Sequence, residues 1–433
     1  MRHIVGFLMA LGLFATSPDA KPLLNSSEET YASVCIAADD TSARLIEICK
    51  LALQEPGASI SQRAQMRETL GYAYKNQDQF KLAEAEFQSM LDGNAASYRA
   101  LRGLGWVAHE RDDYVRAAEL FEASVDLQPT KSGLAGLADS KWEANDISAE
   151  DAIVLFDAAL SLDPEYTWAR RSKGWVLLDV RRFDEALELF GGIVNKDPED
   201  ENALAGLLKA NEKLDQLEVA LDLANRGLQI DPEEDWFLSR RSHLLFKLDR
   251  YRLAMQDADS LIELKPDDAE GYVRKARPMA EQGARCAALS LLAEAEQKVG
   301  PDSYLLYWRA SILLDDGQYD AAATQILRNA EGEDADFYDF ELLSLIQYLR
   351  EDYAQARVAV DRALTLDATQ PFAIYYDAML MLKEDKGVET AMARFDESMQ
   401  AGLPDRIIGE FAGDLIKAGY YAHAIAIRGK YSN

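Results

Sequence analysis

Hydrophobic and polar positions along this chain alternate with a helical spacing that breaks at regular intervals. In the clearest stretch, the pattern predicts a helix over 170–179, a turn over 180–182 and a second helix over 183–196. Asp197-Pro198 then ends the second helix, because proline has no amide hydrogen to donate and disfavours a helical residue before it. The stretch therefore reads as a helical hairpin.

The hairpin is repeated along the chain. Pro198, Pro232 and Pro266 are each 34 residues apart, and an alanine recurs inside each predicted second helix. The alanines stand at Ala83, Ala117, Ala152, Ala186, Ala220, Ala254, Ala288, Ala322, Ala356, Ala391 and Ala424. A fixed period of this size is typical of stacked repeats, since one hairpin cannot bury both of its apolar faces alone. The alternative is an ordinary helical bundle with chance spacing.

Two repeats carry a recognisable motif. Leu70, Gly71 and Tyr74 stand at L-G-x2-Y, and Ala83 and Phe87 follow at A-x3-F. The next repeat has Leu104, Gly105, Ala117 and Phe121 at the matching positions. The sequence therefore resembles the tetratricopeptide repeat, a helix-turn-helix unit. The resemblance implies an all-α fold, a right-handed superhelical solenoid of about eleven repeats, with the array over 61–433.

The first twenty residues have the layout of a secretory signal peptide. Arg2 and His3 precede an apolar run over 4–15, which is too short to span a bilayer, and small residues follow. We therefore predict a signal peptide over 1–20 and an exported protein, periplasmic or else secreted. A buried first helix is the alternative.

Residues 21–60 are predicted to form an N-terminal helical hairpin with one cysteine on each arm. In an oxidising compartment, a disulfide between Cys35 and Cys49 would close a loop of about 15 residues and stabilise the exposed first repeat by about 3 kcal/mol. A catalytic dithiol is the alternative, although C-x-x-C spacing is missing. Cys286 has no predicted partner.

Charge and missing motifs disfavour several classes of function. The formal net charge of −29 disfavours nucleic acid and anionic membrane surfaces as partners. The four histidines are isolated, and the sequence contains neither H-E-x-x-H nor G-x-S-x-G. We predict no catalytic residue, no metal site, no cofactor and no membrane insertion. The acidic segment 331–336 is interpreted as a solvated connection rather than a calcium loop.

The resemblance also implies which side chains face the concave groove, namely positions 2, 5, 9 and 12 of each first helix. The candidate partner-binding residues are Trp106, Trp168, Arg171, Trp175, Lys209, Trp236, His243, Tyr304 and Tyr307. Aromatic anchors with cations among them suit a peptide or protein groove. The alternative for each ring is packing between neighbouring repeats.

These observations predict an exported, non-catalytic scaffold that binds a protein or peptide partner in its groove. A second hypothesis is a carbohydrate-binding accessory of surface polysaccharide export or envelope assembly, because tryptophan faces stack on sugars. An enzyme built from scattered carboxylates is the third. The oligomeric state is left open.

Overall fold

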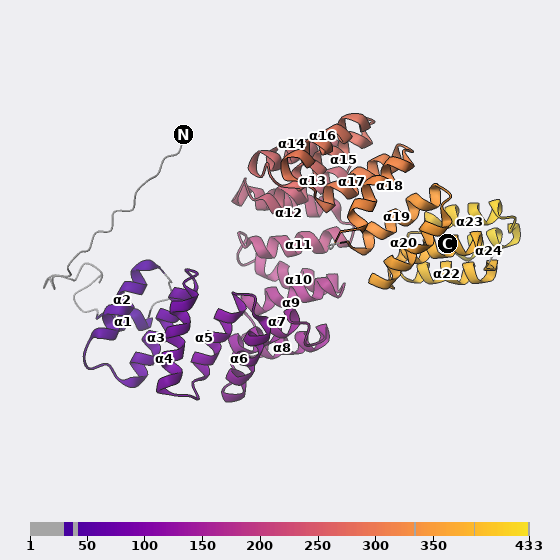
Figure 1. The fold of residues 1–433 in the computed structure, drawn as a ribbon. Helices are drawn as coiled ribbons and strands as arrows, with labels where there is room; N and C mark the ends of the chain where they lie inside the picture. Colours follow the sequence, from indigo (N-terminus) through magenta and orange to yellow (C-terminus); the bar gives the residue numbers. More distant parts are fainter. Residues whose placement is uncertain (1–29, 38–41, 333–334, 385, 432–433) are drawn as a thin grey trace. The chain divides into compact units, whose positions relative to one another are not determined.

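The computed structural model describes residues 30–37, 42–332, 335–384 and 386–431 (Figure 1). Over these residues the chain forms 24 helices and no strand. It divides into two compact units, unit 1 ending at Leu214 and unit 2 beginning at Asp215. The predicted signal peptide, 1–20, lies outside the described residues.

Unit 1 contains eleven helices. They are α1 (Tyr31–Ala37), α2 (Ala43–Gln54), α3 (Ile60–Lys75), α4 (Phe80–Gly93), α5 (Tyr98–His109), α6 (Tyr114–Leu127), α7 (Lys131–Glu143), α8 (Ala149–Leu162), α9 (Thr167–Asp179), α10 (Phe183–Val194) and α11 (Glu201–Lys213).

Unit 2 contains the remaining thirteen. They are α12 (Leu217–Ile230), α13 (Asp235–Lys247), α14 (Tyr251–Leu264), α15 (Ala269–Glu281), α16 (Arg285–Val299), α17 (Ser303–Asp315), α18 (Tyr319–Ala330), α19 (Phe337–Leu349), α20 (Tyr353–Leu366), α21 (Pro371–Lys383), α22 (Val388–Gln400), α23 (Ile407–Lys417) and α24 (Tyr421–Tyr431).

The eleven alanines of the sequence pattern mark the second helices of eleven successive pairs, from α4 to α24. Each of them is at most 2% exposed, because a small side chain at this position lets the paired helices approach closely. The predicted helical repeat solenoid is confirmed.

Within each unit the helices stack in chain order. Odd-numbered helices contact the next odd-numbered helix, as α5 contacts α7 and α17 contacts α19. In the described parts of the chain, even-numbered helices make their main contacts with odd-numbered ones only. The first helices therefore lie closer together than the second helices, and they line the inner side of each stack.

A phenylalanine on the second helix locks consecutive repeats together. The Phe190 ring is completely buried and lies against Gly174 of its own repeat and Gly206 of the next. A Cβ atom would lie 2.6 Å from the ring at Gly174 and 2.4 Å from it at Gly206. The close contact of Gly174 is therefore with the phenylalanine ring. The Phe87 ring lies in the same way between Gly71 and Gly103. The Phe121 ring lies between Gly105 and Gly136.

The N-terminal hairpin of unit 1 is closed by the predicted disulfide between Cys35 of α1 and Cys49 of α2. Their Cα atoms are 5.0 Å apart, and both residues are fully buried. Met66 and Leu70 of α3 belong to the same apolar cluster. The bridge thus lies inside the packing between this hairpin and the first repeat. Cys286 is exposed and free.

Candidate partner-binding surfaces

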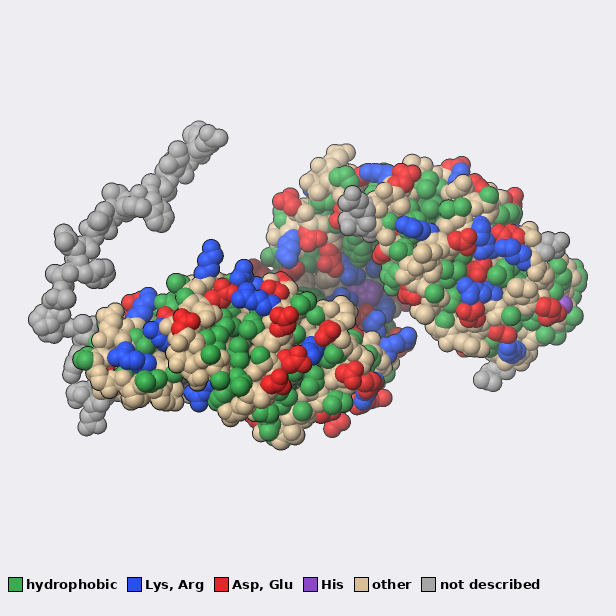
Figure 2. Space-filling view, turned by 60° about the horizontal axis from the view of Figure 1, so that its bottom comes forward, with side chains coloured by type: hydrophobic (Ala, Val, Ile, Leu, Met, Phe, Trp, Pro, Cys, Tyr) green, Lys and Arg blue, Asp and Glu red, His purple; other side chains and the backbone are tan. Residues whose placement is uncertain are grey.

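The nine candidate residues all lie on first helices, and five of them belong to unit 1. Trp106 lies on α5, Trp168, Arg171 and Trp175 lie on α9, and Lys209 lies on α11. In unit 2, Trp236 and His243 lie on α13, whereas Tyr304 and Tyr307 lie on α17. Acidic, basic and hydrophobic side chains are interspersed on the visible face of each unit (Figure 2).

Trp106 and Trp168 contact each other although a whole repeat separates them in sequence. Their ring centroids are 4.7 Å apart in an edge-to-face arrangement, and the Trp106 Nε1–H donates to Ser132 Oγ at 2.9 Å. Ser132 is a small residue of α7, which leaves room for rings from α5 and α9 to meet across it. Trp106 is only 8% exposed, so most of its surface is used in packing. Trp168 is half-buried and keeps part of its surface accessible.

His109 extends this cluster. Its ring lies 5.4 Å from that of Trp106, and its Nε2 lies 2.6 Å from Asp139 Oδ2 on α7. The aromatic cluster therefore has an acidic edge. Glu143 lies on the same side, and burial, together with the Asp139 carboxylate, raises the pKa of its carboxyl group.

Trp175, Arg171 and Lys209 form a second group on α9 and α11. The Lys209 ammonium lies 4.8 Å from the centroid of the Trp175 ring, which is the geometry of a cation–π contact. Arg171 Nη2 donates to Asp200 Oδ2 at 2.6 Å, and Asp200 also caps α11 through the Ala203 N–H. Trp175, Arg171 and Lys209 are all half-buried. Together they present a surface that is partly aromatic and partly basic.

The α13 candidates in unit 2 are also half-buried. The Arg240 guanidinium lies 5.5 Å from the centroid of the Trp236 ring, and Phe237 packs edge-to-face against the same ring at 5.0 Å. His243 lies two helical turns further along α13.

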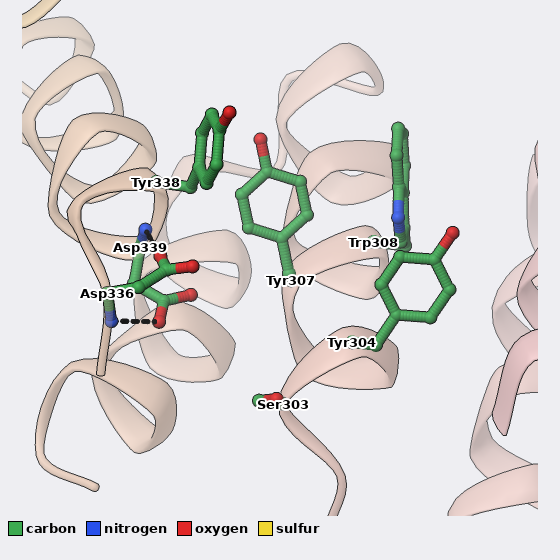
Figure 3. Close-up of a pocket in the computed structure, with 7 residues that line it drawn as sticks. All are labelled: Ser303, Tyr304, Tyr307, Trp308, Asp336, Tyr338 and Asp339. Atoms are coloured by element: carbon green, nitrogen blue, oxygen red, sulfur yellow. Dashed lines mark hydrogen bonds between the residues drawn. The ribbon is translucent and has the colours of Figure 1, made fainter. Parts of the chain in front are cut away.

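Tyr304 and Tyr307 line a hollow of about 330 Å³ between α17 and α19 (Figure 3). The other lining residues are Ser303, Trp308, Asp336, Tyr338 and Asp339. In Figure 3, Tyr307 and Tyr338 extend from facing helices, while the two aspartates stand at the start of α19. Asp336 and Asp339 cap α19 reciprocally, each carboxylate accepting from the other's backbone N–H. Four aromatic rings and two carboxylates thus surround one space.

Acidic groups in and next to the hollow have raised pKa values, because burial removes the water that would solvate their charged forms. Burial, followed by the nearby Asp336, raises the pKa of Glu341, one turn beyond Tyr338 on α19, to about 7. Burial also raises the pKa of the Asp339 carboxyl group, and burial together with Glu341 raises the pKa of Tyr307 to about 12. No lysine or arginine is among the residues that line this hollow.

Arg277 of α15 lies beside the hollow. Its guanidinium is 3.8 Å from the centroid of the Trp308 ring and 4.5 Å from that of Phe246. Burial lowers the pKa of this guanidinium to about 10. One face of Trp308 therefore already carries a cation.

Replacing Glu341 with glutamine is expected to stabilise the protein above pH 7 and to leave its stability unchanged near pH 4. The folded state keeps a proton on Glu341 up to about pH 7, whereas the unfolded chain releases it near the ordinary value of 4.5. Ionisation of Glu341 therefore opposes folding above pH 7, and this penalty disappears as the pH falls to 4.5. Urea unfolding at pH 8 and pH 4 measures the difference. Glu263→Gln, on an exposed position of α14, is the control. A pH-independent difference would contradict the assignment.

The sequence pattern missed Trp308, Asp336 and Asp339, which line this hollow, and Glu341 next to it. Trp308 follows Tyr307 directly and is not at one of the four inward positions. Glu341 is at an inward position, the fifth of α19, but was not among the candidate residues. Asp336 lies at the end of the acidic segment that was interpreted as a solvated connection, and Asp339 follows it in α19. The signal that was available is Asp336 three residues before Asp339, which is the spacing of a capping box.

No group of three or more histidine, cysteine, aspartate or glutamate side chains within the described residues is arranged to hold a metal ion. In that same part of the chain, no helix combines the length and the apolar character needed to cross a membrane.

Comparison with known proteins identifies related repeats in two places. Models of the tetratricopeptide repeat match residues 69–132 and 148–211. No curated protein matches the sequence significantly.

Among solved structures, the fold is similar to a tetratricopeptide repeat protein from Parabacteroides merdae, with 16% identity, a TM-score of 0.49, and coverage of 62% of this chain and 98% of that one. It is also similar to Pseudomonas aeruginosa pilF, with 16% identity, a TM-score of 0.42, and coverage of 49% and 97%. For the Cut9–Hcn1 hetero-tetramer of the APC/C, the identity is 14%, the TM-score 0.43, and the coverage 90% and 86%.

Proposed function

Because the chain is a tetratricopeptide-repeat protein, we propose that it is an exported, non-catalytic scaffold that binds a protein or peptide partner along the inner faces of its stacks. Repeats of this kind generally serve as protein-interaction scaffolds. The observation that carries the proposal is the row of half-buried Trp168, Arg171 and Trp175 on α9, with Lys209 beside it on α11. Rigid aromatic side chains of this type bury a large area at low entropic cost when a partner covers them.

Export is supported by two features of the N-terminal region. The first is the signal-peptide pattern over 1–20. The second is the buried Cys35–Cys49 disulfide, since such bridges persist in oxidising compartments and are rare in the cytosol. We therefore propose that the protein is periplasmic, with secretion as the alternative.

The partner-binding role of α9 is tested by changing Trp168 and Trp175 to alanine. Partners are first recovered by crosslinking in the native compartment followed by mass spectrometry. Loss of two aromatic anchors is expected to weaken binding at least ten-fold, because truncation of such residues commonly costs more than about 1.4 kcal/mol. Binding is measured by titration against each recovered partner.

The matched control is Val154→Ala, which changes a 65% exposed side chain on the second helix α8. Circular dichroism and thermal unfolding of the tryptophan variant establish that the fold is retained, since Trp168 also packs on Trp106. Unchanged affinity for every recovered partner in a folded variant would refute the assignment of α9.

A second candidate function is carbohydrate binding as an accessory of surface polysaccharide export or envelope assembly. The observation that favours it is the hollow between α17 and α19, where tyrosine rings stand next to the carboxylate of Asp336. Rings stack on sugar faces and carboxylates accept hydroxyl hydrogens. Glycan-array binding distinguishes the two functions, because a protein scaffold is expected to give no signal.

A further inference from the structure

We propose that the hollow between α17 and α19 receives a basic side chain, lysine or arginine, from an extended partner segment that lies on the inner face of unit 2. The proposal rests on the proposed scaffold function and specifies the chemistry of the partner.

The walls of the hollow are suited to a cation. Tyr304, Tyr307 and Tyr338 present aromatic rings to a space of about 330 Å³, and Trp308 completes the lining on α17. The π face of such a ring carries negative electrostatic potential and attracts a lysine ammonium or arginine guanidinium within about 6 Å. Trp308 already holds one guanidinium in this manner, that of Arg277 at 3.8 Å. The long aliphatic stem of a basic residue would also bury apolar surface between the tyrosines.

The carboxyl groups around the hollow also favour a cation, although the Arg277 guanidinium lies beside it. Asp336 and Asp339 line it, and Glu341 follows Tyr338 on the same face of α19. Tyr307 on α17 and Tyr376 on α21 face Glu341 from the neighbouring helices, and Arg406 and Glu410 act on Tyr376. Burial holds the pKa of Glu341 near 7, so part of this carboxyl population carries a proton at neutral pH. A positive charge in the hollow would stabilise the ionised form of these carboxyl groups and offset the cost of their burial.

The same arrangement disfavours an anionic ligand. A carboxylate or phosphate in the hollow would face the carboxylates of Asp336 and Asp339. The guanidinium beside the hollow, that of Arg277, already lies against the rings of Trp308 and Phe246. The formal net charge of −29 adds a long-range attraction for basic partners. A lysine- or arginine-containing segment is therefore the occupant that these observations favour.

The test begins with a peptide selection that does not require the identity of the natural partner. A phage-displayed library of random dodecapeptides is selected on the full-length mature protein. The best sequences are synthesised with a fluorescein label and without histidine, aspartate or glutamate. Each is compared with a counterpart in which the basic residue is norleucine, which keeps the aliphatic stem and removes the charge.

We expect selected peptides to share a lysine or arginine, and its replacement by norleucine to weaken binding at least ten-fold in fluorescence anisotropy. Tyr307→Ala is expected to weaken binding similarly, whereas Tyr307→Phe, which keeps the ring face, retains it. Glu341→Gln is expected to weaken binding of the basic peptide only, with Glu263→Gln on α14 as the matched control.

The pH dependence provides an independent readout. A bound cation lowers the pKa of Glu341, so binding releases a proton below about pH 7 and affinity for the basic peptide rises between pH 5.5 and 8. The norleucine peptide and the Glu341→Gln variant are expected to lose this dependence.

Two results would overturn the inference in distinguishable ways. Selected peptides that tolerate norleucine, or that bind Tyr307→Ala unchanged, refute the basic side chain in this hollow and leave the scaffold function standing. If no peptide is selected and a glycan array gives binding instead, the scaffold function fails, and this inference fails with it.

Discussion

Replacing Phe190 with alanine is expected to lower the free energy of unfolding by about 3–5 kcal/mol. The ring is completely buried and fills the space between α9 and α11, where Gly174 and Gly206 leave room for it. Removing it leaves a cavity that the glycines cannot fill, since neither has a side chain. Urea unfolding measures the loss. In a linear stack each repeat contacts only its neighbours, so hydrogen exchange is expected to accelerate mainly in α9, α10 and α11.

Gly191→Ala is the control for this prediction. Gly191 is adjacent to Phe190 on α10, and an added Cβ would meet no atom within 4 Å. Because alanine favours a helix interior by about 0.5–1 kcal/mol relative to glycine, this variant is expected to be neutral or more stable. A loss from Phe190→Ala no larger than about 1 kcal/mol would show that the repeats close around the missing ring.

The paired change of Cys35 and Cys49 to alanine is expected to destabilise the N-terminal hairpin by about 2–4 kcal/mol. The bridge joins two short helices, α1 and α2, which would otherwise be held by packing on each other and on α3. Both cysteines are buried, so reduction of the native protein is expected to be slow until the hairpin opens. Hydrogen exchange of α1 and α2 with and without the bridge provides the measurement.

Cys286→Ser serves as the matched control, because this thiol is exposed and free. It is expected to change neither the exchange rates nor the unfolding midpoint. Equal protection of α1 and α2 in the cysteine-free and parent proteins would contradict a stabilising role for the bridge.

The repeat architecture was predictable from the sequence because two kinds of residue recur at a nearly constant spacing, alanine in the second helices and aspartate in the turns. The alanines at Ala83 and every later repeat are almost fully buried, so selection for close helix packing is strong enough to be read without a structure. The turn between paired helices carries a similar signal. Asp78, Asp112 and Asp249 adopt positive φ there, a conformation that aspartate tolerates better than most residues.

The inner surface was less predictable because position in a helix does not determine exposure. Trp106 and Trp168 occupy inward positions, yet Trp106 is almost completely buried because Ser132 on the intervening helix is small. The burial of Trp106 thus depends on the size of a residue in the next repeat. A prediction that considers one helix at a time cannot take that residue into account. The hollow beside Tyr307 depends similarly on Asp336, which precedes the next first helix.

The position of Phe190 between two glycines has a consequence for how this chain can change during evolution. Gly206 belongs to the repeat that follows, so the complementary surfaces of ring and glycine are encoded in different repeats. A duplication or deletion that starts at a first helix would therefore join a phenylalanine to a new neighbour, and a side chain in the place of Gly206 would meet the ring. Phe87 with Gly103 and Phe121 with Gly136 are pairs of the same kind in unit 1, so an exchange among these repeats would keep each ring opposite a glycine.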